Sequence, residues 1–471
     1  MGVNLSSIKF FFLLISIFVL IATLIFNYQN SSKNITSKYT NITHSIIDYS
    51  LTEKVGHKWL KELCAIGPRL SGSVESELAI NWAVNKFKEI NCDTVWLQPV
   101  MVPRWVRGIK ESAIISKSQK FAERKLNIAS LGGSVGTDSK NVTGQVFEIK
   151  KFGDLKNIDI SKTKGKIFFF NEPFDETFSN TFEAYGKAVQ QRVYGVDEAA
   201  KLGAIAVVVR SVTSKYDNIP HVGTLFYSDS VKRIPGVSIG VEDADFLSNL
   251  LKEEPFAEIS LEIDCHTLPD VESYNVIAEI RGNELPEEII VVGGHLDSWD
   301  KGCGAQDAAA PCIQTIEVLH QLKTLGLHPK RTIRCVLFTN EENGLKGAMK
   351  YGEYSAVHKE KHVAAIESDR GVFEPRGFYV EAETEIIGKM EEWLPLLMET
   401  KIDWIKKGGS GADISRIKGT SAKIGFAPDD QKYFDYHHSD NDIFETVNPR
   451  EMQLGTAAIT LLAYLISEEG L

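Results

Sequence analysis

The sequence predicts an α/β protein whose mostly parallel, mixed sheet is flanked by helices and interrupted by an inserted, β-rich α/β domain. The first observation is a set of apolar runs in the last third of the chain, each ending in polar or acidic residues: EEIIVVGGH, RTIRCVLFTNEE and HVAAIESD. Amphipathic stretches such as IQTIEVLHQLKTLG separate them, as expected for buried parallel strands alternating with helices. The second observation is a change of texture over residues 105–270, where short strands with glycine punctuation predominate.

The N-terminus carries an uncharged apolar run from Phe10 to Phe26, preceded by Lys9. Such a run indicates a signal peptide or an N-terminal signal anchor over residues 1–28. No small-x-small cleavage site follows it and its length is intermediate, so cleavage and retention both remain open, with retention slightly favoured. Membrane attachment through this segment is therefore one expectation.

Residues 29–50 are polar and are expected to form a glycosylated linker. The N-x-S/T acceptors are Asn30, Asn34 and Asn41, with a further acceptor at Asn141. These features place the protein in the secretory pathway: secreted, lumenal or lysosomal, or membrane-anchored with its catalytic body outside the cytoplasm.

Composition narrows the class of protein. A net charge of -11 disfavours a nucleic-acid partner, since phosphate binding needs a basic surface. Six cysteines are too few for a disulfide scaffold of 471 residues, and no CxxC pair offers a thiolate metal site. Disulfide pairing stays open.

The main domain is expected in two parts, residues 51–104 and 271–471, on either side of the insert at 105–270. The first part has helix, turn, helix and strand patterns, ending in TVWLQPV. The insert has strands at GKIFFF, AIAVVVR and IPGVSIG and a helix over GVDEAAKLG, but it carries no cluster of metal ligands. Its expected role is structural or lid-forming.

Metal-ligand side chains gather at the predicted carboxyl ends of strands, where open α/β sheets place their sites. They are His295, Asp307, Glu341 with Glu342, Asp369 and His438. Imidazoles and carboxylates of this kind suit two divalent cations and a water between them. Asp307 is a candidate to bridge both ions, although alone it would be read as a helix cap.

Neighbouring residues complete the predicted site. Asp297, two residues beyond His295, is expected to hydrogen-bond the imidazole and fix its tautomer. Glu341 and Glu342 point in different directions at a strand end and can divide metal binding from proton transfer. Only one of His437 and His438 is expected to be a ligand, and the other lines the pocket.

The motifs GPRLSG, GHLDSWDKGCGAQD, TNEENG, ESDRG and HHSDND resemble those of metallopeptidase family M28 over almost the whole chain beyond the leader. The resemblance implies the zinc exopeptidase fold, with an eight-stranded sheet and a protease-associated insert, and a homodimer that hydrolyses dipeptides or short peptides. It implies two Zn²⁺, with Asp307 as the bridge and Glu341 as the general base. The implied ligands besides Asp307 are His295, Glu342, Asp369 and His438.

One departure from the family pattern follows the bridging aspartate, where Ala308 to Pro311 replace the usual acid and glycines. This departure motivates an alternative, a catalytically impaired receptor or binding protein of the same fold. A second alternative is a single-zinc enzyme resembling a glutaminyl cyclase. Nucleophilic serine catalysis is disfavoured because no G-x-S-x-G motif precedes a helix, and Ser410 in a glycine-rich loop is expected to shape the pocket.

Overall fold

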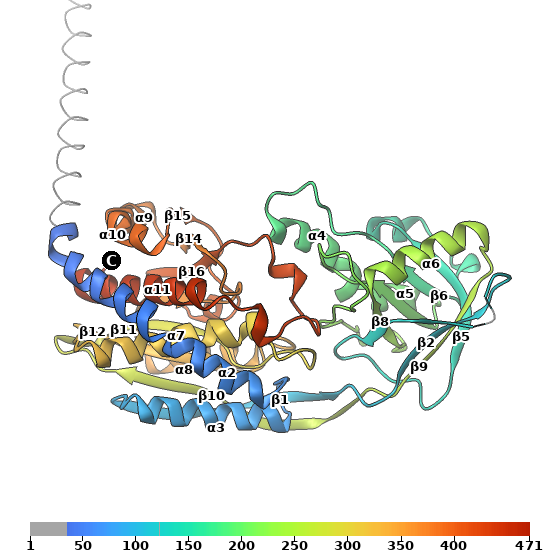
Figure 1. Ribbon diagram of the computed structural model, residues 1–471. Helices are drawn as coiled ribbons and strands as arrows, with labels where there is room; N and C mark the ends of the chain where they lie inside the picture. The colour runs from blue at the N-terminus through green and yellow to red at the C-terminus, as the bar shows by residue number, and fades with distance from the viewer. Residues whose placement is uncertain (1–34, 122) are drawn as a thin grey trace, which may run out of the picture.

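The computed structural model describes residues 35–121 and 123–471, which form two eight-stranded sheets with helices packed against them (Figure 1). The α/β class and the mixed sheet flanked by helices are confirmed. The apolar run from Phe10 to Phe26 and the acceptors Asn30 and Asn34 lie outside the described residues. Among the residues that are described, no helix has both the length and the apolar character needed to cross a membrane.

The first sheet has the strand order β1-β10-β12-β11-β13-β16-β14-β15. Its central strands β12, β11, β13 and β16 run parallel to one another, whereas β1 and β10 pair antiparallel at one edge. The central strands are buried on both faces, which explains their continuous apolar sequences. The bounds are β1 Thr94–Val106, β10 His266–Ile280, β11 Leu285–His295, β12 Arg331–Phe338, β13 Lys361–Glu367, β14 Pro375–Glu381, β15 Trp404–Lys407 and β16 Ala422–Pro428.

Helices cover both faces of this sheet. The strands alternate their side chains between two clusters, so that Val292 packs with α7 and α11 while Val291 packs with α8. The final helix is buried along most of its length. The bounds are α2 Val55–Ile66, α3 Val74–Glu89, α7 Ala310–Thr324, α8 Lys346–His358, α9 Thr384–Glu391, α10 Leu394–Leu397 and α11 Pro449–Glu469.

The second sheet lies entirely between β1 and β10 in the sequence, in the order β3-β2-β9-β5-β6-β7-β8-β4. It has its own apolar core, and Figure 1 shows it beside the first sheet, at the far end of the long β1 and β10 strands. The bounds are β2 Glu111–Lys117, β3 Arg124–Leu126, β4 Ile128–Ser130, β5 Val142–Ile149, β6 Ile167–Phe170, β7 Ala206–Arg210, β8 Gly236–Ile239, β9 Glu258–Ile263, α4 Thr181–Val193, α5 Gly195–Lys201 and α6 Val241–Glu253. We call this unit the insert.

A polar linker was expected over residues 29–50. For the residues of this range that the structure describes, the expectation is wrong, because residues 35–53 form a helix. Its apolar residues recur at helical spacing, and two of them, Tyr39 and Ile46, are buried against the main core. Tyr39 also donates a 2.5 Å hydrogen bond to Glu469 near the end of α11. Surrounding polar residues, including the exposed Asn41, obscured this stripe in the sequence.

Candidate metal centre

His295 is the last residue of β11, and its buried ring faces two carboxylates. Its Nε2 lies 2.9 Å from Oδ1 of Asp369 and 3.3 Å from Oδ1 of Asp307. Its Nδ1 lies 2.9 Å from the main-chain oxygen of Asp297, to which the ring N–H donates. This contact leaves Nε2 free to bind a metal ion.

The expected hydrogen bond between Asp297 and the His295 imidazole is present, but the main-chain oxygen of Asp297 makes it rather than the carboxylate. The carboxylate lies 3.9 Å from Nδ1, while the main-chain carbonyl makes the contact. The carboxylate instead accepts hydrogen bonds from the backbone N–H groups of Glu341, at 3.1 Å, and Glu342, at 3.4 Å. Because these amides lie in the turn after β12 and need an acceptor, the carboxylate of Asp297 fixes the acidic pair, while its main-chain oxygen fixes the imidazole.

Asp307 lies in an irregular turn between Gly304 and the start of α7. Gly304 has a positive φ of 56°, and the Asp307–Ala308 peptide bond is cis. Asp442, from the HHSDND motif, accepts hydrogen bonds from the backbone N–H groups of Gln306, at 2.7 Å, and Asp307, at 3.0 Å. Sequence reasoning did not assign a role to Asp442, although its motif was recognised.

The alanines after Asp307, where the family resemblance implies an acid and glycines, are buried, and Ala309 and Ala310 belong to the main core. Ala308, Ala309 and Ala310 are fully buried, and Pro311 occupies the first turn of α7, where a missing N–H is tolerated. The carboxylate of Asp307 still faces the other candidate ligands. The substitution therefore leaves the proposed bridging position intact.

His437 and His438 are stacked, with ring centroids 3.5 Å apart. Nε2 of His438 lies 3.2 Å from Oδ2 of Asp307 and 3.1 Å from Oε2 of Glu342. Nε2 of His437 is farther from the same Asp307 oxygen, at 3.6 Å. The structure therefore brings both histidines to the cluster, with His438 the better placed to share a metal ion with Glu342.

The donor atoms form two groups whose members lie within 4.8 Å of one another, and both groups contain Asp307. One group is His295, Asp307 and Asp369, and the other is Asp307, His437 and His438. Oδ2 of Asp307 is buried and makes no hydrogen bond. A shared carboxylate whose Oδ2 makes no hydrogen bond and faces Nε2 of both His437 and His438 fits a pair of zinc ions.

The charges of the cluster also fit bound cations. Burial raises the pKa of Glu342 to about 7, and the negative charge of Asp307 adds to this effect. Burial likewise raises the pKa of Glu341 well above its usual value, with Asp369 reinforcing the shift against the opposing charge of His295. Within residues 35–121 and 123–471, no lysine or arginine forms an ion pair with these acids.

A cavity of ≈ 450 Å³ opens onto the cluster, and Glu341 and Glu342 line it together with Asp307, Asp369 and both histidines. Sequence reasoning missed the part of its wall that comes from the insert, namely Phe182, Tyr185, Arg192 and Thr224. Nothing in the local sequence of the insert marks these residues as functional, since they come from a helix and an ordinary loop.

Ser410 does not line this cavity, contrary to expectation. Its hydroxyl and its backbone N–H both donate 2.9 Å hydrogen bonds to Oε1 of Glu381. The side chain is buried, so the glycine-rich loop is anchored to β14 rather than open to the cavity.

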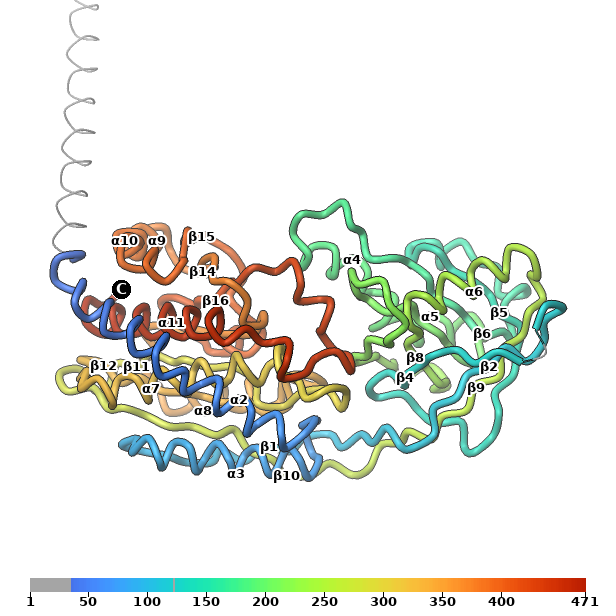
Figure 2. Tube along the Cα trace, in the orientation of Figure 1, coloured from blue at the N-terminus to red at the C-terminus, as the bar shows by residue number. Residues whose placement is uncertain are grey.

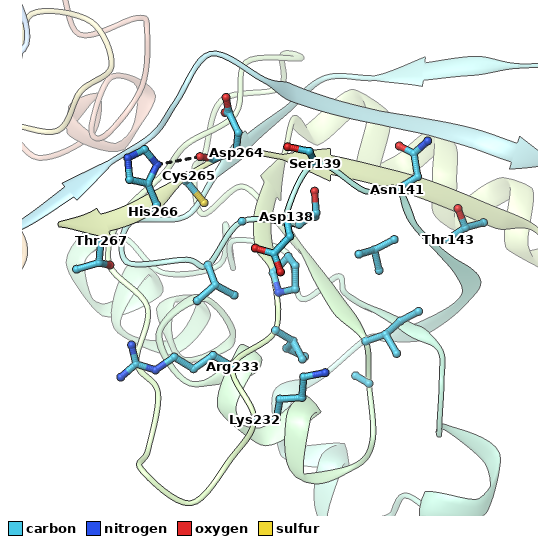
Figure 3. A pocket seen from close by; sticks show the side chains of 18 residues that line it. Asp138, Ser139, Asn141, Thr143, Lys232, Arg233, Asp264, Cys265, His266 and Thr267 are labelled. Carbon is cyan, nitrogen blue, oxygen red and sulfur yellow. Dashed lines mark hydrogen bonds between the residues drawn. The ribbon is translucent and has the colours of Figure 1, made fainter.

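A second, larger cavity of ≈ 990 Å³ lies in the insert (Figure 3). Its wall mixes both signs of charge, with Asp138, Lys232 and Arg233 among the labelled side chains. The exposed acceptor Asn141 also lies on this wall. None of the candidate metal ligands is present there, so this cavity is separate from the metal centre.

An α/β fold that brings imidazoles and acids from strand ends and loops to one cavity is the arrangement of a metallopeptidase. Residues 275–463 match the family model for peptidase family M28, and the chain belongs to this family. It is similar to carboxypeptidase Q of Xenopus laevis, with 36% identity over 437 residues that cover 92% of this chain and 90% of that protein. Human carboxypeptidase Q is 34% identical over 433 residues, which cover 91% of this chain and 89% of that protein.

Solved structures of related peptidases have the same fold as this chain. A peptidase M28 precursor from Shewanella amazonensis has a TM-score of 0.87 and 29% sequence identity, covering 92% of this chain and 97% of that chain. A zinc aminopeptidase from Bacillus subtilis shares the fold, with a TM-score of 0.62, 19% identity, and 87% of this chain and 93% of that chain covered.

Proposed function

We propose that the protein is a zinc-dependent exopeptidase that hydrolyses dipeptides or short peptides. The observation that carries this proposal is the pair of donor groups sharing Asp307, with Glu341 beside them on the same cavity wall. His295 and Asp369 would hold one zinc ion, Glu342 and His438 the other, and Asp307 both. When bound, zinc supplies a Lewis acid that lowers the pKa of a water molecule towards ~7 and polarises a carbonyl group.

Glu341 is the proposed general base. Its carboxylate would accept the proton of the attacking water and then deliver a proton to the leaving amine. Asp297 holds the backbone of Glu341 by a 3.1 Å hydrogen bond, so the base starts from a fixed position. The cavity volume of ≈ 450 Å³ is within the range of pockets that bind small ligands, which favours short substrates.

The purified protein, treated with a chelator and then reloaded, tests this proposal on a panel of dipeptides. We expect two zinc ions per chain and turnover that returns with zinc. Panels with blocked amino or carboxyl ends would then distinguish carboxypeptidase, aminopeptidase and strict dipeptidase action. A metal-free, inert protein would instead support the receptor or binding-protein alternative, and one zinc with cyclase activity would support the other alternative.

We further propose that the protein enters the secretory pathway and acts as a homodimer. The apolar N-terminal run and the exposed acceptors Asn41 and Asn141 support the first part. The second part rests on the family resemblance. Glycosidase treatment and sedimentation of the expressed protein would test the two parts separately.

A further inference from the structure

The loop that carries His438 is held from the insert rather than only from the main domain. Figure 2 shows the segment before α11 (red) reaching across to the insert near α4 and β8. Val222 donates its backbone N–H to the carbonyl of His438 at 2.8 Å. His221 donates from Nδ1 to the carbonyl of His437 at 2.7 Å, and Thr213 donates to the carbonyl of Phe434 at 2.6 Å.

The same residue of the insert also contacts the imidazole ring of His438. The carbonyl of Val222 lies 3.2 Å from Nδ1 of His438, and Nε2 is the nitrogen that faces Asp307 and Glu342. A metal-binding histidine is usually oriented by a hydrogen bond from its other ring nitrogen to such an acceptor. The insert therefore supplies the group that sets the orientation and tautomer of one candidate ligand.

Arg192 on α4 fixes that carbonyl in turn. Its side chain is only 5% exposed, and Nη1 donates to the oxygen of Val222 at 3.1 Å while Nη2 donates to the Tyr185 hydroxyl at 2.8 Å. Nη1 also lies 3.4 Å from Nδ1 of His438, farther than the Val222 oxygen at 3.2 Å, so the guanidinium contacts the ring as well as its acceptor. No carboxylate among residues 35–121 and 123–471 forms an ion pair with it. The guanidinium fits over Gly223, where an added Cβ would overlap it.

Burying a guanidinium without a carboxylate partner costs free energy of folding. The hydrogen bond from Arg192 to the Val222 carbonyl connects this guanidinium to one candidate metal ligand, His438. We propose that Arg192 is a positioning residue that acts through the Val222 carbonyl to hold His438 for metal binding. The inference rests on the proposed function, because it concerns the ion shared by Glu342 and His438. The insert would then help to hold a metal ligand, which goes beyond the structural or lid-forming role expected from its sequence.

The test compares Arg192→Ala with the wild-type protein by titrating apoprotein with Zn²⁺ against a competing chelator. We expect one of the two zinc affinities to fall about 10–100-fold, as is typical when a group that orients a ligand is lost, and the other to change little. Co²⁺ loading should show an altered absorption spectrum for one ion. Arg192→Lys, which can still donate to the carbonyl, should recover most of the affinity.

A matched control is Arg210→Ala, which removes another buried arginine of the insert, paired with Asp245 and outside the cavity wall. It should leave both zinc affinities unchanged. If Arg192→Ala does not fold, Arg192→Met, which keeps most of the side-chain length without its donors, should give the same loss at one ion. Wild-type affinities, or equal weakening of both ions, in either folded variant would overturn the inference alone. Absence of zinc from the wild-type protein would overturn the proposed function as well.

Discussion

Individual residues at the centre have separable roles because each contacts different atoms. Asp307 is common to both donor groups, whereas Glu341 belongs to neither and lines the cavity next to them. The main-chain oxygen of Asp297 orients His295, while its carboxylate secures the turn that carries Glu341. Substitutions at Glu341 and Asp307 should therefore affect turnover and metal content differently.

Glu341→Gln should reduce kcat by a factor of about 10²–10⁴ while both zinc ions remain bound, because it removes the proton acceptor without removing a ligand. Metal analysis of the purified variant and its dipeptide kinetics provide the two measurements. Retained turnover would transfer the base role to another group.

Asp307→Asn should lower zinc content at both positions, because a carboxylate shared by two donor groups becomes an amide with one poor ligand atom. Asp369→Asn is the matched control, since it belongs to one group only and should weaken one ion. Two tightly bound zinc ions in Asp307→Asn would argue against the bridge.

At the level of helices and strands, the elements predicted well were those whose apolar residues form a clear pattern. The strands ending at His295, Phe338 and Glu367 were recognisable as apolar runs, and their carboxyl ends located the site. The helix over residues 35–53 was missed because its apolar stripe is narrow and sits among polar residues. The contact between Val222 and His438 could not be predicted, since it runs through main-chain atoms that leave no mark in the sequence.

The helix over residues 35–53 should contribute to stability. Ile46→Ala is expected to lower the free energy of unfolding by about 2–4 kcal/mol, because the side chain is fully buried and the change leaves a cavity. Asp48→Ala, on the exposed face of the same helix, should change it by less than about 0.5 kcal/mol. Denaturant unfolding of both variants makes the comparison, and equal effects would mean that the helix is not docked in solution.

Glu317 on α7 gives a pH-dependent test of the packing between α7 and α11. Burial raises its pKa to about 7, against hydrogen bonds from Gln453 and Thr456 on α11 that lower it. A carboxyl with a raised pKa in the folded state gives its full contribution to stability below its unfolded pKa of about 4.5 and loses it as the pH rises to about 7.

The difference in free energy of unfolding between Glu317→Gln and the parent should therefore favour the variant more at pH 8 than at pH 4.5, by at most about 3 kcal/mol. Thermal unfolding of variant and parent across this range measures the difference. A difference that does not change with pH would show that Glu317 titrates normally in the folded protein.

At the scale of the whole molecule, the two sheets form separate cores but one metal centre. The main domain supplies the donor atoms from strand ends, a turn and a loop, and the insert supplies part of the cavity wall and holds the loop of His437 and His438. Among the described residues, the buried acids of the cluster form no ion pair with a lysine or arginine, so bound cations should stabilise the folded state over the unfolded chain.

Removing metal with a chelator should lower the midpoint of thermal unfolding by several degrees. Zinc at a hundred times its Kd contributes about 2.7 kcal/mol to the folded state, and each kcal/mol shifts the midpoint by about 1 °C in a chain of this size, because the entropy of unfolding is about 2.1 cal/mol/K per residue. Calorimetry with and without added zinc measures the shift. An unchanged midpoint would mean that the cluster holds no stabilising cation.

One carboxylate serving two donor groups makes the two binding equilibria interdependent. The first cation changes the affinity for the second by a certain factor, because it orders the Asp307 side chain and repels a like charge. Binding of the second cation changes the affinity for the first by the same factor. Metal uptake should consequently depart from two independent isotherms, and activity should follow the doubly loaded species rather than total zinc.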